Sequence, residues 1–304
     1  MAEQWIKEYV DCLKAGDFSN MLLLKEVNFP KSFFKYRNLN VRSLDNIEKG
    51  YQWISEINKL NDPFECTLLL DNNAVLKDMF SHEATIQRLL KKGFTHEEIT
   101  ILSNSSDAFQ MYKDLSEKKG IAIPFSSSEQ NNRFQNSWQA DFLNVTNKMR
   151  ICSFSTINDS ILLWALYSDE ARGICIEYDF LNENKIRPFM QPVFYNNDAT
   201  TVKTFQEMNS YYHIAASISK SEHWEYEREW RFTLLPGSTE IISNILNVPT
   251  PIAIYTGVKY EQNDNQLKKR LEEIAKKLSI PIFQMEKHVS EYRYILKQKR
   301  DREI

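Results

Sequence analysis

Apolar and polar residues alternate at both ends of the chain, with a long stretch of helical period between them, and this arrangement constrains the fold most. Near the amino terminus, SFFKYRN sets Phe34 and Tyr36 against Lys35 and Arg37, which is the period of a half-buried strand. The same period returns after residue 150 in RICSFST, GICIEYDF, PVFYN, WRFTLL, PIAIYTG, PIFQM and YRYIL. Strands that gather at both ends, with helices between them, predict an α+β fold.

The length of 304 residues is compatible with a single elaborated domain over residues 1–304, which is what we expect. The domain is predicted to have four parts: a helical prelude over 1–30, a first strand segment over 31–72, a helical insertion over 73–149 and a main α+β segment over 150–304. The insertion is charged and rich in Gln, Asn and Ser, and its polar run SSSEQNN is typical of a mobile loop.

Several further elements are expected outside the insertion. YQWIS looks like a second strand, and SLDNIEKG predicts a short helix with Ser43 as its N-cap and Gly50 as its C-terminal stop. Helices are also predicted over NDSILLWALYSDEA, residues 201–220 and residues 263–278.

Composition and charge exclude several classes of protein. The hydrophobic content of 42% is too high for a disordered chain, and the net charge of −3 gives no overall attraction to nucleic acid or anionic membranes. The first residues lack a basic start followed by an apolar run, and the longest apolar stretch, ILLWALY, is too short to span a bilayer. We therefore expect no membrane partner. The four cysteines are scattered without a C-x-x-C pair, which fits a cytoplasmic localisation.

Glycine and histidine patterns exclude two familiar kinds of site. The seven glycines form no G-x-G-x-x-G or G-x-x-x-x-G-K pattern, so Rossmann and P-loop nucleotide binding are not expected. The five histidines form no H-E-x-x-H or close pair, and we predict no metal. In NDPFEC, Asp62 and Glu65 are compatible with a divalent ion, but the pattern favours a turn that Asp62 and Asn61 fix.

The stretch HWEYEREWRF carries the strongest candidate for chemistry. If it is extended throughout, Glu225, Glu227, Glu229 and Arg231 project to one side, because residues two apart in a strand share a face. Clustered carboxylates shift one another's pKa values, as acid–base chemistry requires. The alternative is an edge strand whose charges prevent aggregation.

Two more pairs offer polar groups for a ligand. Ser153 and Ser155 flank Phe154, and their hydroxyls are able to orient a sugar or an amide, although serine is common on strand faces. Tyr36 precedes Arg37, whose planar guanidinium suits a phosphate or carboxylate and equally an internal ion pair.

An aromatic pair lies in ILLWALY. Trp164 and Tyr167 are three residues apart and meet on one face of the predicted helix. Such a stripe serves either as core or as a platform for a ligand.

The order of these segments is similar to the signature blocks of a bacterial family known as domain of unknown function 2971. The blocks lie between residues 33 and 257 and read KYRNLN, WISEINKLNDPFEC, ICSFSTINDSILLWALYSDEARGICIEYD, HWEYEREWRF and IYTG. In addition, Arg37, the pair Ser153 and Ser155, and the pair Glu227 and Glu229 resemble, in order, the arginine, serine and glutamate motifs of ADP-ribosyltransferases. Phe154 stands where that class typically has threonine.

The transferase resemblance implies a fold and a set of roles. The fold is a split mixed or antiparallel sheet like that of the ADP-ribosyltransferases, here with a helical insertion. The implied substrate is NAD. Arg37 would position it, and Ser153 and Ser155 would support its ribose. Beside these motif residues, we expect Tyr36, Trp164 and Tyr167 to line the NAD-binding cleft. Glu229 would stabilise the transition state, and Glu227 would deprotonate the acceptor.

The expected activity is ADP-ribosyl transfer to a macromolecular acceptor, either protein or nucleic acid. Families of this kind imply a toxin or phage-defence effector, with a regulatory partner or antitoxin. Three alternatives stay open: an NAD glycohydrolase, a non-enzymatic interaction or sensor module, and a metal-dependent nuclease that uses Asp62, Glu65, Glu227 and Glu229.

Overall fold

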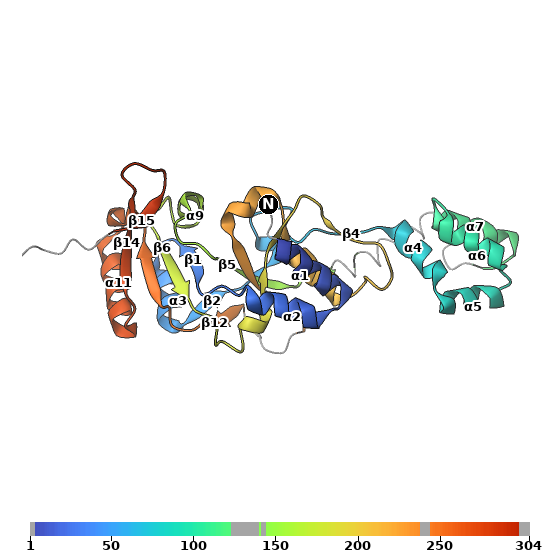
Figure 1. The fold of residues 1–304 in the computed structure, drawn as a ribbon, viewed down its shortest axis with the longest axis horizontal. Helices are drawn as coiled ribbons and strands as arrows, with labels where there is room; N and C mark the ends of the chain where they lie inside the picture. The colour runs from blue at the N-terminus through green and yellow to red at the C-terminus, as the bar shows by residue number, and fades with distance from the viewer. Residues whose placement is uncertain (1–3, 123–139, 141–143, 238–243, 298–304) are drawn as a thin grey trace, which may run out of the picture.

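A nine-stranded mixed sheet forms the centre of the protein, of which a computed structural model describes residues 4–122, 140, 144–237 and 244–297 (Figure 1). Its strands run in the order β15-β14-β13-β6-β1-β5-β11-β7, and β3 also pairs with β5. The pairing of β13 with β14 is parallel, and the other pairings are antiparallel. The predicted α+β fold is therefore confirmed. The run SSSEQNN lies outside the described residues.

Most strands of the central sheet follow the predicted alternating segments, but β3 overlaps the predicted strand YQWIS only at Ser55, and β7 overlaps PVFYN only at Pro192. Their bounds are β1 Phe33–Arg37, β3 Ser55–Glu56, β5 Arg150–Ser155, β6 Ile174–Tyr178, β7 Met190–Pro192, β11 Glu229–Leu234, β13 Ala253–Thr256, β14 Ile282–Lys287 and β15 Tyr294–Leu296.

Three two-stranded sheets surround the central one. They pair β2 (Tyr51–Trp53) with β12 (Ile245–Asn247), β4 (Leu68–Leu70) with β9 (Thr200–Val202), and β8 (Phe194–Tyr195) with β10 (Ser219–Lys220).

The sheet divides where β1 leaves β5. The two strands pair at Phe34 opposite Ser155, whereas β1 pairs with β6 along its whole length. Further along β5, its edge is taken by β3, with Ser55 opposite Ile151. Between these contacts, the carbonyl of Ser153 accepts a hydrogen bond from the ammonium of Lys35. We call this division between β1 and β3 the fork.

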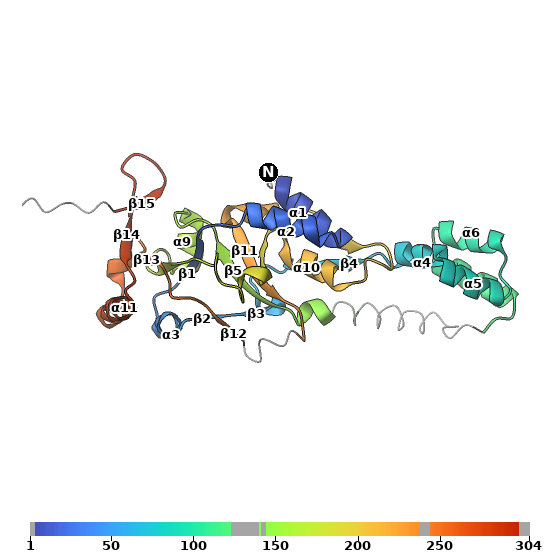
Figure 2. The same cartoon turned by 60° about the horizontal axis from the view of Figure 1, so that its bottom comes forward.

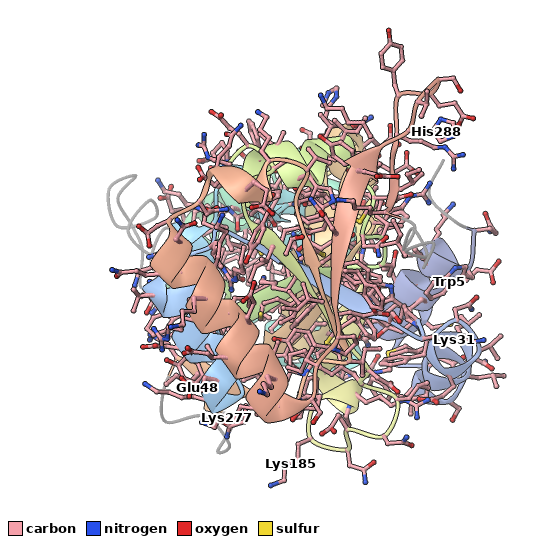
Figure 3. The ribbon with its side chains drawn as sticks, turned by 90° about the vertical axis from the view of Figure 1, so that its left-hand side faces the viewer. Trp5, Lys31, Glu48, Lys185, Lys277 and His288 are labelled. Atoms are coloured by element: carbon pink, nitrogen blue, oxygen red, sulfur yellow. The ribbon has the colours of Figure 1, made fainter. Side chains whose placement is uncertain are left out.

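Helices cover both faces of the sheet near the fork. Helices α3 (Val41–Lys49) and α11 (Asn265–Leu278) pack on one face, and α9 (Ile161–Tyr167) lies on the other (Figure 2). Lys277 donates to Glu48 at 2.8 Å, and Figure 3 shows the two side chains where α11 meets α3. The main core lies between the sheet and these two helices.

The caps of α3 explain one difference from expectation. The side chain of Asn40 accepts from the backbone N–H of Ser43, so the helix begins before the expected cap. The predicted stop is confirmed: Gly50 has φ of 67° and donates to the carbonyls of Asn46 and Ile47.

Helices α1 (Gln4–Ala15) and α2 (Phe18–Val27) pack with α10 (Ser210–Ile218) around a cluster of their own (Figure 2). The helix expected over 201–220 is shorter because β9 and β10 take its two ends. The side chain of Asn209 caps α10 by accepting from the N–H groups of Tyr211 and Tyr212.

In the described part of the predicted insertion, residues 144–147 are helical, and before them lie the helices α4 Asn72–Ser81, α5 Glu83–Lys91, α6 His96–Asn104 and α7 Ala108–Lys118. Their hydrophobic cluster draws on residues 76–121 alone. Figure 1 shows them at the end of the molecule opposite α11. The described residues also include short 3-10 helices, namely η1 Ile57–Lys59, η2 Arg187–Phe189, η3 Glu222–Glu227 and η4 Tyr260–Gln262. Among the described residues, no helix combines the length and apolar character needed to cross a bilayer.

Candidate active site at the fork

A pocket of 350 Å³ opens at the fork, and we call it the fork pocket. Its lining comes from β1, β5, α9, β10, the start of β11 and the segment 55–65. Seven of the eight residues that the sequence singled out as catalytic or NAD-binding line it, namely Tyr36, Arg37, Ser153, Ser155, Tyr167, Glu227 and Glu229. None of the helices α4 to α7 contributes to the lining.

The sequence suggested that the stretch HWEYEREWRF is extended throughout, but in the structure it is not. Residues 222–227 form η3, and the strand begins only at Glu229. Between them Arg228 adopts a left-handed conformation, with φ of 45°. The expectation that four charged side chains share one strand face is therefore wrong for Glu225, which lines a different pocket beside Arg228. Glu227 and Glu229 nevertheless converge, because the turn at Arg228 brings both carboxylates to the same lysine.

That lysine, Lys220 at the end of β10, lies among three carboxylates. Its Nζ is 2.6 Å from Glu227 Oε2, 3.0 Å from Glu229 Oε2 and 3.1 Å from Glu65 Oε1. All four side chains are at most 7% exposed. The ammonium thus balances carboxylates contributed by three separate segments.

Arg231 provides the second cation of this group. Its Nε donates to Glu229 Oε1 at 2.9 Å, and one terminal nitrogen lies 2.7 Å from Glu65 Oε2. The other terminal nitrogen donates to the carbonyl of Ser217 at 2.6 Å. Together, Glu65, Lys220, Glu227, Glu229 and Arg231 form the buried ion cluster. Three carboxylates against two cations leave it with one excess negative charge when every member is ionised.

The two glutamates of the β11 segment have opposite pKa shifts. Burial, together with the charge of Glu229, raises the pKa of Glu227. Burial also opposes ionisation of Glu229, but the charges of Arg231 and Lys220 outweigh it and hold the pKa of Glu229 well below its ordinary value. Paired carboxylates whose pKa values are pushed apart are typical of a proton-transferring group beside a permanently charged one.

Neighbouring hydroxyls fix these glutamates in place. Ser155 Oγ donates to the backbone carbonyl of Glu227 at 2.7 Å, and a hydrogen bond from Ser153 helps to lower the pKa of Glu229. Tyr167 donates to Glu227 Oε1 at 2.7 Å and accepts from the side-chain amide of Asn61 at 3.0 Å.

Trp164 is the one predicted site residue that does not line the pocket, and this expectation is not met. Its side chain is 0% exposed, and its indole N–H donates to the carbonyl of Asn158 at 2.7 Å. Its ring packs edge-on against Tyr36, with centroids 5.3 Å apart. Tyr36 in turn donates to the carbonyl of Ile157 at 3.0 Å, so its hydroxyl is already bonded within the protein.

Arg37 differs from Arg231 in its partners. One terminal nitrogen donates to Gln52 Oε1 at 3.0 Å, and within the described residues the guanidinium forms no ion pair. Its Nε is buried without a hydrogen-bond partner. Burial lowers the pKa of Arg37.

Sequence reasoning missed two lysines of the site, Lys220 and Lys35. Lys220 follows Ser219 and Lys35 follows Phe34, each in a short strand, and nothing in these local patterns marks either lysine as functional. The usable signal was charge balance, because buried carboxylates require buried cations from elsewhere in the chain.

The geometry bears on the metal alternative. Among the described residues, no three or more His, Cys, Asp or Glu side chains are arranged to hold a metal ion. The position between Glu65, Glu227 and Glu229 is taken by the ammonium of Lys220. Asp62 accepts from the N–H of Phe64 at 2.9 Å, which is the bond of a turn.

Comparison with known proteins gives one match. The family described as "Protein of unknown function (DUF2971)" matches residues 163–232. This segment contains Tyr167 and all of the buried ion cluster except Glu65, and it confirms the predicted likeness to that family over its length. No curated protein and no solved structure matches the chain.

Proposed function

We propose that the protein is an NAD-dependent ADP-ribosyltransferase and that the fork pocket is its active site. One observation carries the proposal: an arginine from β1, two serines from β5 and two glutamates from the β11 segment line a single pocket. These groups come from positions between 37 and 229, so their convergence is a property of the fold. The division of the sheet at the fork also agrees with the split sheet that the transferase resemblance implies.

The ionised carboxylate of Glu229 suits the cleavage of a nicotinamide–ribose bond. When that bond breaks, nicotinamide leaves with the bonding electron pair and positive charge develops on the ribose. The low pKa of Glu229 keeps its carboxylate ionised, and this fixed negative charge would stabilise the developing cation more than the substrate.

Glu227 is suited to the second proton-handling role. Its raised pKa lies closer to the neutral range than that of an ordinary carboxyl group, which favours a general base. It would take the proton of the acceptor nucleophile as that nucleophile bonds to the ribose carbon. Water in place of the acceptor would give NAD hydrolysis by the same groups.

The direct test is incubation of the full chain with NAD labelled in its adenylate part, together with a cell extract. Label that becomes attached to protein or nucleic acid supports transfer, and label released only as ADP-ribose shows hydrolysis. Glu227→Gln should lower the rate of NAD cleavage about a hundredfold or more, since general-base catalysis typically contributes that much. The matched control is Glu225→Gln, because Glu225 lines a different pocket. Intact NAD after incubation with the folded wild-type protein would reject the proposal.

The nuclease alternative predicts activity that a chelator abolishes, and it requires a metal ion to displace Lys220 from its three carboxylates. The sensor alternative treats the buried ion cluster as structural only and predicts no turnover of NAD. The effector role, the acceptor and a regulatory partner or antitoxin stay predictions.

A further inference from the structure

A second pocket of 480 Å³ adjoins the fork pocket, and we call it the basic pocket. The two share the lining residues Tyr36, Arg37, Ser55, Lys59 and Tyr167. The basic pocket extends from there over the start of α3 and the end of β2, with Arg42, Asn46 and Trp53 in its wall. A ligand of sufficient length can therefore occupy both pockets at once.

The charge of the basic pocket is opposite to that of the buried ion cluster. Arg37, Arg42 and Lys59 line it, and its lining contains no carboxylate. Within the described residues, Lys59 pairs with Glu56 outside the lining, whereas Arg37 and Arg42 form no ion pair. Cations gathered without acidic partners favour an anionic ligand.

The wall also holds buried polar atoms that the protein leaves unbonded. Asn46 is only 5% exposed, and its Oδ1 has no hydrogen-bond partner. The Nε of Arg37 is buried and likewise has none. An unsatisfied buried donor or acceptor destabilises the fold in the absence of a partner. An acceptor and a donor in one pocket call for a ligand that carries both N–H or O–H groups and negatively charged oxygens.

An aromatic surface lies beside these groups. Trp53 is 37% exposed, and the guanidinium of Arg42 lies over its ring, 5.2 Å from the ring centroid. Exposed tryptophan is a common platform for nucleobases, because every base is able to stack on an aromatic ring.

We propose that the basic pocket binds a nucleoside diphosphate. Arg37, Arg42 and Lys59 would hold the two phosphates, the base would stack on Trp53, and Asn46 Oδ1 would accept from a hydroxyl or amino group of the nucleoside. The inference rests on the proposed function in so far as this nucleoside diphosphate is the part of NAD that does not react.

The test is a calorimetric titration of the full chain with ADP, which lacks the bond to be cleaved. ADP should bind to the wild-type protein, inorganic pyrophosphate should compete, and adenosine should bind more weakly. Arg42→Ala and Trp53→Ala should each weaken ADP binding at least tenfold, whereas Trp53→Phe should retain most of it. Arg88→Ala is the matched control, because Arg88 lies on α5, which contributes nothing to either pocket.

The outcomes separate this inference from the proposed function. ADP that fails to bind wild-type protein, or that binds Arg42→Ala and Trp53→Ala as tightly as wild type, overturns the inference even if NAD is cleaved. ADP binding that needs Arg42 and Trp53, without cleavage of NAD, supports the inference and rejects the transferase. Because both side chains are exposed, the variants should fold, and an unchanged thermal transition without ligand verifies this.

Discussion

The fork pocket and the basic pocket share Arg37 in their linings, but they differ in whether their charged side chains form ion pairs within the protein. In the fork pocket, the carboxylates of Glu65, Glu227 and Glu229 each bond to a buried cation, either Lys220 or Arg231. In the basic pocket, the guanidiniums of Arg37 and Arg42 have no carboxylate among the described residues. The comparison indicates that ion pairs within the protein stabilise the buried ion cluster, whereas the two guanidiniums of the basic pocket are left for a ligand to neutralise.

The largest expected effect is the loss of the central cation. Lys220→Met should lower the free energy of unfolding by about 3–5 kcal/mol, because it leaves three buried carboxylates around a missing charge. Lys277→Met is the matched control: Lys277 also bonds to a glutamate, at 2.8 Å, but is 64% exposed, so its loss should cost about 0–1 kcal/mol. Urea denaturation measures both. Equal losses would mean that the buried ion cluster does not stabilise the fold.

The second prediction compares the two glutamates. Glu229→Gln should cost roughly 3 kcal/mol at neutral pH, because it leaves Arg231 and Lys220 with a neutral partner. Glu227→Gln should cost clearly less, because the raised pKa of Glu227 shows that its charged form is already disfavoured.

The pH dependence of stability tests separately the directions of the pKa shifts of Glu229 and Glu227. The folded-state pKa of Glu229 is lowered, so its ionised form stabilises the fold above about pH 4.5, and this contribution is lost as the pH falls further. The gap in unfolding free energy between wild type and Glu229→Gln should therefore narrow in acid. For Glu227, whose pKa is raised, the contribution of the neutral form is lost as the pH rises instead. A gap for Glu229→Gln that widens below pH 4.5 would contradict the assignment.

A smaller effect is expected at Tyr167. Tyr167→Phe removes the hydrogen bond to Glu227 and should cost about 1 kcal/mol of stability. That bond lowers the pKa of Glu227, so its loss should raise this pKa and move the acid limb of NAD cleavage to higher pH. Tyr226→Phe, next to Glu227 in the chain, serves as the control for the pH–rate profile. Identical profiles for wild type and Tyr167→Phe would exclude Glu227 as the titrating base.

The smallest effect on stability belongs to the basic pocket. Arg42→Ala should change the free energy of unfolding by no more than about 0.5 kcal/mol, because Arg42 is exposed and forms no ion pair within the described residues. Thermal denaturation without ligand measures it. If Arg42→Ala lowered the free energy of unfolding as much as Lys220→Met does, the basic pocket would stabilise the fold as the buried ion cluster does, and the proposed difference between them would be wrong.

The sequence predicted the sheet better than the site. Strands such as β1 and β11 were recognisable because alternation reports directly which side chains are buried. The turn at Arg228 was not, because a left-handed arginine is decided by tertiary packing and carries no local signal. Trp164 was placed in the cleft because residues three apart share a helix face, but spacing does not say whether that face meets a pocket or the core.

The cations of the site were the hardest part to predict. Lys220 bonds to Glu65 and Lys35 bonds to the carbonyl of Ser153, both far away in the chain, and a turn separates Lys220 from Glu227 and Glu229, so no spacing rule connects them. Arg37 was found from its motif, but its missing counter-ion became visible only in three dimensions. Local patterns therefore reveal elements, whereas the balance of charge in a pocket is a property of the assembled chain.

The register of β5 and β11 ties the chemistry of the fork to the aromatic interior. Ser155 is opposite Glu229 and Ser153 is opposite Arg231, while the residues between them, Phe154 and Trp230, point into the core on the reverse side. A shift of either strand by one position would exchange the two sets, driving acids into the apolar interior and rings into the cleft. A single inserted or deleted residue within either strand would therefore remove the acids from the pocket and expose the aromatic side of the strand.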